Sequence, residues 1–287
     1  MTQILFGNYE PDIASIRTDR TSTVSNVLPS ENGYGPFAGT TPLTTALAAR
    51  CLGFFSTKDL TGASHTFAGT ASALYKLDNT ALTWEDVSKG GGYTVGTGSY
   101  WSFAQFGNVV IAVTNSNNPQ AYTLNSSTDF ADLAGSPPQA KYVEVIGDFL
   151  VLVGLTANTN RIQWSALNNI TSWTPGTASS DYQDFPDGGF VVGAGGGEFG
   201  IVFQEDAVRR MIFNPSSSTI FDFSRIVEGM GLYMPYSLVK SSANLFFYAS
   251  DGFYMMSPNG ALKPIGANRV DRTFIADADL DDDRYLI

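Results

Sequence analysis

Short apolar runs that end at Gly, Asn, Asp or Pro alternate with polar stretches along most of this chain. The clearest pair is residues 245–248 and 253–256, which are mainly aromatic and are separated by Ser250-Asp251-Gly252. An Asp-Gly pair between two such runs favours a β-hairpin, because the glycine can adopt a positive φ. We therefore predict a hairpin over residues 245–256, followed by a turn at Pro258-Asn259-Gly260.

The same pair of runs recurs upstream, and its spacing predicts the fold. The second run of each pair ends at Leu77, Leu124, Trp164, Phe213 and Met256, which are 47, 40, 49 and 43 residues apart. This period is typical of the four-stranded blades of a β-propeller. The second runs are residues 73–77, 121–124, 161–164, 210–213 and 253–256, and their partners are residues 65–70, 109–113, 149–153, 200–203 and 245–248.

Each repeat is completed by an opening strand and a short closing strand. The opening strands are predicted at residues 48–55, 101–106, 140–146, 190–193 and 237–240, and the polar loops after the second runs lead to Trp84, Phe130, Trp173 and Phe221. Helical periodicity is scarce. The fold class is therefore all-β, a β-propeller of five or six four-stranded blades over residues 46–287, and a pair of β-sandwiches is the alternative.

The two ends of the chain differ from the repeats. Residues 1–45 are rich in turn residues, and Pro29 and Pro36 favour extended backbone before them. We predict an extended N-terminal arm that lies across another surface. The last seven residues stop just as an apolar run begins, so we expect a longer protein with a further blade or domain.

Composition narrows the possible partners. The net charge is −11 and no stretch gathers lysine and arginine, which argues against a protein that grips phosphates. An acidic wall would instead suit a surface past which DNA slides. Cys51 is the only cysteine, so neither an internal disulfide nor a cysteine-rich metal site is expected. The start lacks a signal-peptide pattern and no run has the roughly 18 apolar residues of a membrane span, so we expect synthesis in a reducing cytoplasm.

Two motifs invite a catalytic or nucleotide-binding interpretation. His65 is the only histidine, and without a Gly-x-Ser-x-Gly elbow a structural role is favoured for it. Residues 195–200, GGGEFG, satisfy G-x-G-x-x-G, but a strand-like run follows where a phosphate-binding helix is required. We expect a tight turn between strands there.

Acidic residues are the remaining candidates for chemistry. Asp277, Asp279 and Asp281 alternate as at the start of a calcium loop, but the required glycine is replaced by Asp282, so a solvated acidic loop that includes Asp283 is favoured. Glycan-cleaving propellers use paired carboxylates, and no spacing singles out a pair here. The carboxylates considered are Asp187, Glu205, Asp206, Asp222 and Asp251.

Two groups of neighbouring charges are predicted to form surface ion pairs. They are Arg209-Arg210 near Glu205-Asp206, and Arg269 with Asp271-Arg272. Surface pairs of this kind are weak, and their expected use is to set the register between subunits. The sequence thus predicts no catalytic residue, no cofactor-binding residue and no metal ligand, and the protein is not expected to be an enzyme.

Residues 26–37 and 251–274 resemble stretches of bacteriophage tail proteins, namely the hub, nozzle or packaged-DNA stabilisation proteins of short-tailed phages. The resemblance implies a homo-oligomeric, hexameric ring of propeller subunits in the virion tail, assembled in the host cytoplasm. It implies a portal-proximal adaptor and other tail proteins as partners, and DNA that passes through the lumen without sequence-specific binding. It implies no cofactor and no membrane anchor. The alternative is a carbohydrate-binding or carbohydrate-cleaving β-propeller of a phage or bacterium.

Overall fold

The structure is a computed structural model that describes residues 7–14, 16, 20–30, 33–217, 219–241, 243–257 and 259–278. It divides into two compact units, Leu43–Pro235, and Met1–Pro42 with Tyr236–Ile287. Within the described residues there are five four-stranded antiparallel sheets, each with its strands in chain order. Such up-and-down sheets, one after another along the chain, are propeller blades. The chain is an all-β protein with the β-propeller fold.

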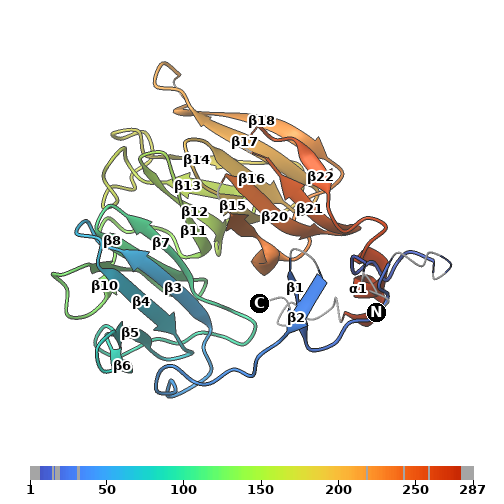
Figure 1. Ribbon diagram of the computed structural model, residues 1–287. Helices are drawn as coiled ribbons and strands as arrows, with labels where there is room; N and C mark the ends of the chain where they lie inside the picture. The colour runs from blue at the N-terminus through green and yellow to red at the C-terminus, as the bar shows by residue number, and fades with distance from the viewer. Residues whose placement is uncertain are drawn as a thin grey trace. The chain divides into compact units, whose positions relative to one another are not determined.

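Four of the five blades lie in the unit Leu43–Pro235 and follow one another from β3 to β18 (Figure 1). The first blade is β3 (Gly53–Lys58), β4 (Ser64–Gly69), β5 (Leu74–Asp78) and β6 (Thr83–Asp86), and the second is β7 (Ser102–Phe106), β8 (Val109–Thr114), β9 (Asn117–Thr123) and β10 (Ala131–Asp132). The third is β11 (Ala140–Ile146), β12 (Phe149–Leu155), β13 (Arg161–Trp164) and β14 (Asp181–Asp184), and the fourth is β15 (Val191–Gly195), β16 (Gly200–Gln204), β17 (Ala207–Phe213) and β18 (Phe221–Glu228).

The fifth blade belongs to the other unit and contains the predicted hairpin. Its strands are β19 (Val239–Ser241), β20 (Asn244–Ala249), β21 (Gly252–Met256) and β22 (Leu262–Pro264), preceded by a short 3-10 turn, η1 (Pro235–Ser237). β20 pairs with β21 from Leu245↔Met256 to Ala249↔Gly252, and Gly252 has a φ of 148°. The hairpin prediction is therefore confirmed, together with the use of glycine at its turn.

The core of the four-blade unit lies between blades. Every residue of β12 is buried, as expected for a strand with a neighbouring sheet on each face, and its sequence is correspondingly apolar throughout. Three apolar clusters join blade one to two, two to three and three to four. A single sheet of this size could not bury both faces alone, so each blade depends on its neighbours.

Glycine allows one of these inter-blade contacts. Trp101 is buried against the first blade, donates its indole N–H to Thr70 O over 2.8 Å and lies edge-on to Tyr93. A Cβ built at Gly69 would lie 2.2 Å from Trp101 Cδ1, and one at Gly53 would lie 2.6 Å from Trp101 O. Trp101 therefore fits only because β3 and β4 of the first blade carry glycine, Gly53 against its backbone and Gly69 against its indole.

The predicted strand positions are correct for most strands, with two corrections. The first strand begins at Gly53 and not near residue 48, because residues 43–51 are loop. Trp173 does not lead into the closing strand of its blade, which is β14, eight residues further on. Trp173 lies in the β13–β14 loop with its side chain buried in the cluster between blades two and three. The predicted turn at residues 195–200 is confirmed, since β15 ends at Gly195 and β16 begins at Gly200.

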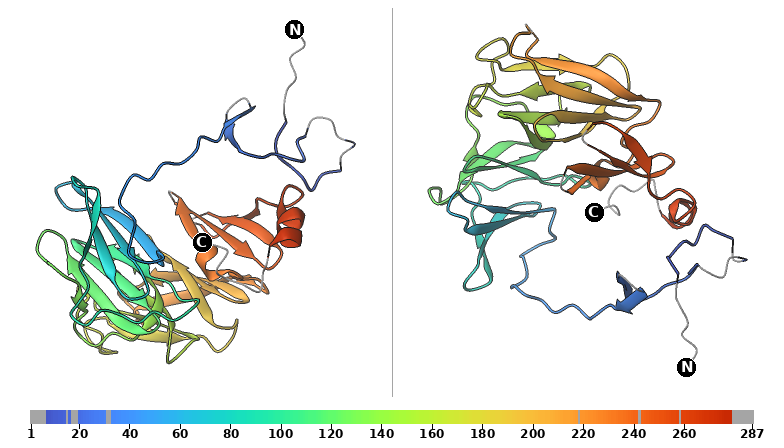
Figure 2. Two further views of the ribbon diagram at one scale, coloured as in Figure 1. Left: turned by 90° about the horizontal axis from the view of Figure 1, so that it is seen from below. Right: turned by 45° about the horizontal axis from the view of Figure 1, so that its top comes forward.

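The N-terminal arm is extended, as predicted, and its described residues contain no helix. Its one regular element is a hairpin that the sequence did not predict, β1 (Val27–Ser30) with β2 (Gly33–Pro36) (Figure 2). A second unpredicted element is the helix α1 (Asp271–Asp277) after the fifth blade. Asp277 is thus helical, whereas the other aspartates of the acidic run and the last seven residues lie outside the described residues. No helix in the described part of the chain has the length and hydrophobicity of a membrane span.

Candidate functional site

Three of the carboxylates considered for glycan cleavage are bound by different neighbouring groups. Glu205 accepts the N–H of Phe190 at 2.8 Å, Asp222 accepts Asn214 Nδ2 at 2.7 Å, and Asp251 accepts the Tyr254 hydroxyl at 2.8 Å. The remaining two lie beside Glu205 on the two adjoining loops. Asp187 forms ion pairs with two arginines, and Asp206, exposed at the β16–β17 turn, donates its N–H to Gly188 O at 3.0 Å. Among the described residues no three His, Cys, Asp or Glu side chains gather as metal ligands would.

Two of the arginines predicted to form ion pairs, Arg209 and Arg269, have other partners. Arg209 pairs with Asp187 on the β14–β15 loop and also donates to Gln204 Oε1 at 2.6 Å, so Glu205 and Asp206 are not its partners. Its guanidinium lies over the ring of Phe185 at 4.8 Å. Arg269 pairs with Glu10 of the arm and not with Asp271. Sequence proximity misled here because the fold brings together residues that are distant in sequence.

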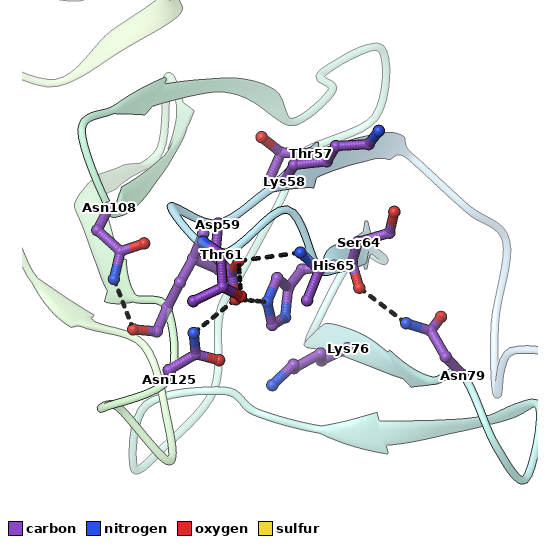
Figure 3. A network of polar contacts seen from close by, with 12 residues as sticks. Thr57, Lys58, Asp59, Thr61, Ser64, His65, Lys76, Asn79, Asn108 and Asn125 are labelled. Atoms are coloured by element: carbon purple, nitrogen blue, oxygen red, sulfur yellow. Dashed lines mark hydrogen bonds and ion pairs between the residues drawn. The ribbon is translucent and has the colours of Figure 1, made fainter.

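A group of polar side chains around Asp59, called the node below, joins the first two blades (Figure 3). Its side chains are those of Asp59, Thr61, His65 and Asn125. Asp59 follows β3, and its buried carboxylate accepts the N–H of Thr61 at 2.8 Å and the N–H of Ala63 at 3.0 Å, which closes the β3–β4 turn. The same carboxylate accepts Asn125 Nδ2 at 2.6 Å from the second blade. Because one charged side chain fixes its own turn and reaches the neighbouring sheet, the node holds the two blades in register.

His65 is part of this node. It lies in β4, it is buried, and its Nε2 is 3.0 Å from Asp59 Oδ2. Hydrogen bonds from Thr61, Asn125 and His65 lower the pKa of Asp59 strongly, so the carboxylate is ionised and Nε2–H is the donor. The contact is a structural one, since the ring nitrogen binds a carboxylate that closes the β3–β4 turn and reaches the second blade.

The first part of the N-terminal arm, residues 10–14 and 20, is fixed to helix α1 and is called its root below. Asp12 accepts the N–H groups of Arg272 and Thr273 at 2.8 and 2.9 Å, and the Thr273 hydroxyl at 2.8 Å. The residue at the N-cap of this helix, Val270, makes no side-chain cap. Asp12 is about 260 residues away in sequence. It therefore caps N–H groups at the start of α1 that have no acceptor within the helix.

Two further acidic side chains support the root. Glu10 is buried and accepts both Arg20 Nη1 at 3.0 Å and Arg269 Nε at 3.3 Å. Burial raises the pKa of Asp271, which accepts the N–H of Phe253. Burial would also raise the pKa of Asp12, but the hydrogen bonds from Arg272 and Thr273 outweigh it and hold that pKa below its usual value. The arm is thus anchored by an ionised Asp12.

Replacing Asp12 with alanine should loosen the root without unfolding the blades. We expect a loss of about 1 kcal/mol, the usual cost of removing a helix cap. Hydrogen–deuterium exchange should show faster exchange in α1 and in residues 8–14, with the strands of blades one to four unchanged. Asp206→Ala, at an exposed turn, is the matched control and should change neither segment. Equal protection in both variants would contradict the cap.

Beyond its root, the arm has a single charged residue and exposes apolar side chains. Between Arg20 and Arg50 the only charged residue is Glu31. Leu28 and Phe37 are 52% and 53% exposed, and Leu43, where the arm meets the first blade unit, is 78% exposed. Depletion of charge together with exposed apolar and aromatic side chains is the composition of the buried part of a protein interface. The arm is therefore the candidate functional site.

No family model matches this chain, and no curated protein matches it. Similar solved structures include the extracellular domain of a hybrid two-component system from B. thetaiotaomicron, with 9% identity and a TM-score of 0.48 over 77% of this chain and 30% of that one. YCF48 from Cyanidioschyzon merolae has 10% identity and a TM-score of 0.44 over 70% and 68%. BamB from Moraxella catarrhalis has 13% identity and a TM-score of 0.43 over 74% and 60%. The chain thus spans under a third of the two-component domain, and at such identities a likeness concerns the fold and says nothing about function.

Proposed function

We propose that this protein is a structural subunit of the tail of a short-tailed bacteriophage, at the hub or nozzle. Identical subunits form a hexameric ring in which each arm lies on a neighbouring subunit or on the portal-proximal adaptor. The ring retains packaged DNA in the virion and passes it during ejection, with no bond-breaking chemistry. The resemblance of residues 26–37 and 251–274 to such proteins supports this assignment.

The observation that carries the proposal is the arm. Its root is fixed by Asp12 and Glu10, whereas the stretch from residue 21 to 49 has one charge and exposes Leu28, Phe37 and Leu43. A contact made by one patch on a different patch of the next copy is heterologous, and such contacts close into rings when the rotation fits. The net charge of −11 favours passage of DNA over its retention by contact.

Assembly tests the proposal directly. Mass photometry of the full chain should show a six-chain species, and deletion of residues 1–42 should leave monomers. The double variant Leu28→Asp/Phe37→Asp should also remain monomeric, because it places charges in the proposed interface, while its melting temperature stays that of the parent, since both side chains are exposed.

Leu60→Asp is the control, because Leu60 is 85% exposed at the β3–β4 turn and outside the arm. It should assemble as the parent does. A parent chain that stays monomeric alone and with the adaptor, or an arm variant that assembles normally, would overturn the proposal.

A further inference from the structure

A cavity of about 360 Å³ opens in the four-blade unit where the second blade leads into the third. It is lined by the side chains of Asn118 and Asp132 and by residues 133–137, which connect β10 to β11. Its volume is within the roughly 300–1,000 Å³ of small-molecule sites. None of the residues in the proposed oligomer contact lines it.

The carboxylate of Asp132 is held in place by two side chains that donate hydrogen bonds to it. Its Oδ1 accepts Lys89 Nζ and Gln120 Nε2, both at 2.6 Å. Gln120 is fully buried, and its Oε1 accepts the Tyr93 hydroxyl at 3.2 Å. Hydrogen bonds from Lys89 and then Gln120 lower the pKa of Asp132, and Lys89 balances its charge. The cavity therefore contains an ionised, oriented acceptor whose charge is paired with that of Lys89.

The other polar atoms at the cavity leave capacity for a ligand. Among the described residues Asp132 Oδ2 accepts from Asn118 Nδ2 alone, over 3.3 Å, and the Asp132 side chain is 47% exposed. Asn118 Oδ1 accepts Gln139 Nε2 over 3.4 Å. Both distances are at the weak end of hydrogen bonding, so a better-placed donor or acceptor could compete with them. Ser136 adds a hydroxyl to the same wall.

The wall of the cavity is held by contacts to both neighbouring blades. Leu133 donates its N–H to Pro119 O at 2.7 Å, and Gly135 and Ser136 both have positive φ, 87° and 57°. A Cβ built at Gly135 would lie 2.0 Å from Thr171 O of the third blade, so the loop packs directly on its neighbour. A site held in this way requires little ordering when it binds a ligand.

We propose that this cavity binds a neutral saccharide. The fixed carboxylate suits adjacent hydroxyl donors, and Asn118 and Ser136 both donate and accept, as the hydroxyls of a sugar require. Pro137 and Ala134 offer carbon surface to the C–H face of a sugar ring. The Asp132 carboxylate repels an anionic ligand. A cationic ligand has to compete with Lys89 for the same carboxylate, so neutral sugars are favoured over both.

Saturation-transfer NMR with glucose, galactose, N-acetylglucosamine and lactose tests the site, with N-acetylneuraminic acid and glucosamine as the charged comparators. At least one neutral sugar should bind with a Kd on the order of 1 mM, since the cavity is open and small. Ala134→Trp, which fills the cavity from an exposed position, should weaken binding at least about tenfold. Ala81→Trp, at the exposed β5–β6 turn, should bind as the parent does.

Asp132→Asn keeps the shape of the side chain and removes the ionised acceptor, so it should weaken binding as well and decides the matter if Ala134→Trp does not fold. No signal from any neutral sugar at about 10 mM, ten times the expected Kd, would overturn the proposal. So would equal binding by all variants, or preference for a charged comparator or for a peptide library. Mass photometry of the same variants should show unchanged assembly, which separates this test from that of the proposed function.

Discussion

Replacing Trp164 with alanine is expected to lower the free energy of unfolding by about 3–5 kcal/mol, as for other large buried aromatic side chains. Trp164 ends β13, is 1% exposed and lies edge-on to Phe221 of the next blade with ring centres 5.0 Å apart. Its indole N–H donates to Ser179 O at 2.9 Å. The substitution opens a cavity between two blades and also removes the donor to the Ser179 carbonyl.

Urea unfolding followed by circular dichroism measures this loss without depending on the fluorescence of the deleted residue. Trp84→Ala is the matched control, since Trp84 occupies β6 of the first blade, is only partly buried and donates to Thr44 Oγ1 at 3.3 Å. Its loss should be roughly 1 kcal/mol. Equal losses at the two positions would contradict the expectation that the contact of Trp164 between blades three and four contributes more to stability than the contact of Trp84.

Replacing Asp59 with asparagine is the second large effect, and it depends on pH. Asparagine can still accept from Thr61 and Ala63, but its Nδ2 would face the donors of His65 and Asn125. We expect the melting temperature at pH 7 to fall on the order of 5 °C. Asp78→Asn is the control, because Asp78 accepts only the backbone N–H groups of Thr80 and Ala81 within its own turn.

The sign of the pH dependence follows from the lowered pKa of Asp59. A carboxyl group whose folded pKa is lower than its unfolded pKa stabilises the fold above the unfolded value, about 3.9, and this contribution is lost as the pH falls through the folded value. The gap between parent and variant should therefore be full at pH 7 and 5 and shrink below about pH 4. Thermal unfolding at pH 7, 5 and 3 tests this, and a gap that grows on acidification would contradict it.

The strands could be predicted because each is a local pattern. Apolar runs such as Phe149–Leu155 need no distant information, and Asp-Gly or Gly-Asn pairs mark the turns between them. Trp173 was misplaced for the same reason, since a tryptophan after a polar loop resembles the start of a strand. Only the neighbouring blade, which buries it beside Leu133, shows that it belongs to a loop.

The features that position the arm and the node could not be predicted, because their partners are far apart in sequence. Helix α1 is seven residues long, too short to form alone, and its cap comes from Asp12. The turn at Asp59 is visible in Asp59-Leu60-Thr61-Gly62, since Asp favours such turns. Nothing local indicates that Asn125, 66 positions on, supplies the inter-blade hydrogen bond.

Every described blade is made from one uninterrupted segment, with no strand borrowed from elsewhere in the chain. Hydrogen bonding within each sheet is therefore completed as soon as its fourth strand leaves the ribosome, and the pairing partners are always close in sequence. During synthesis the sheets can then form one at a time, beginning with the sheet nearest the N-terminus. In evolution, duplication or loss of one segment would change the number of sheets without cutting any of them.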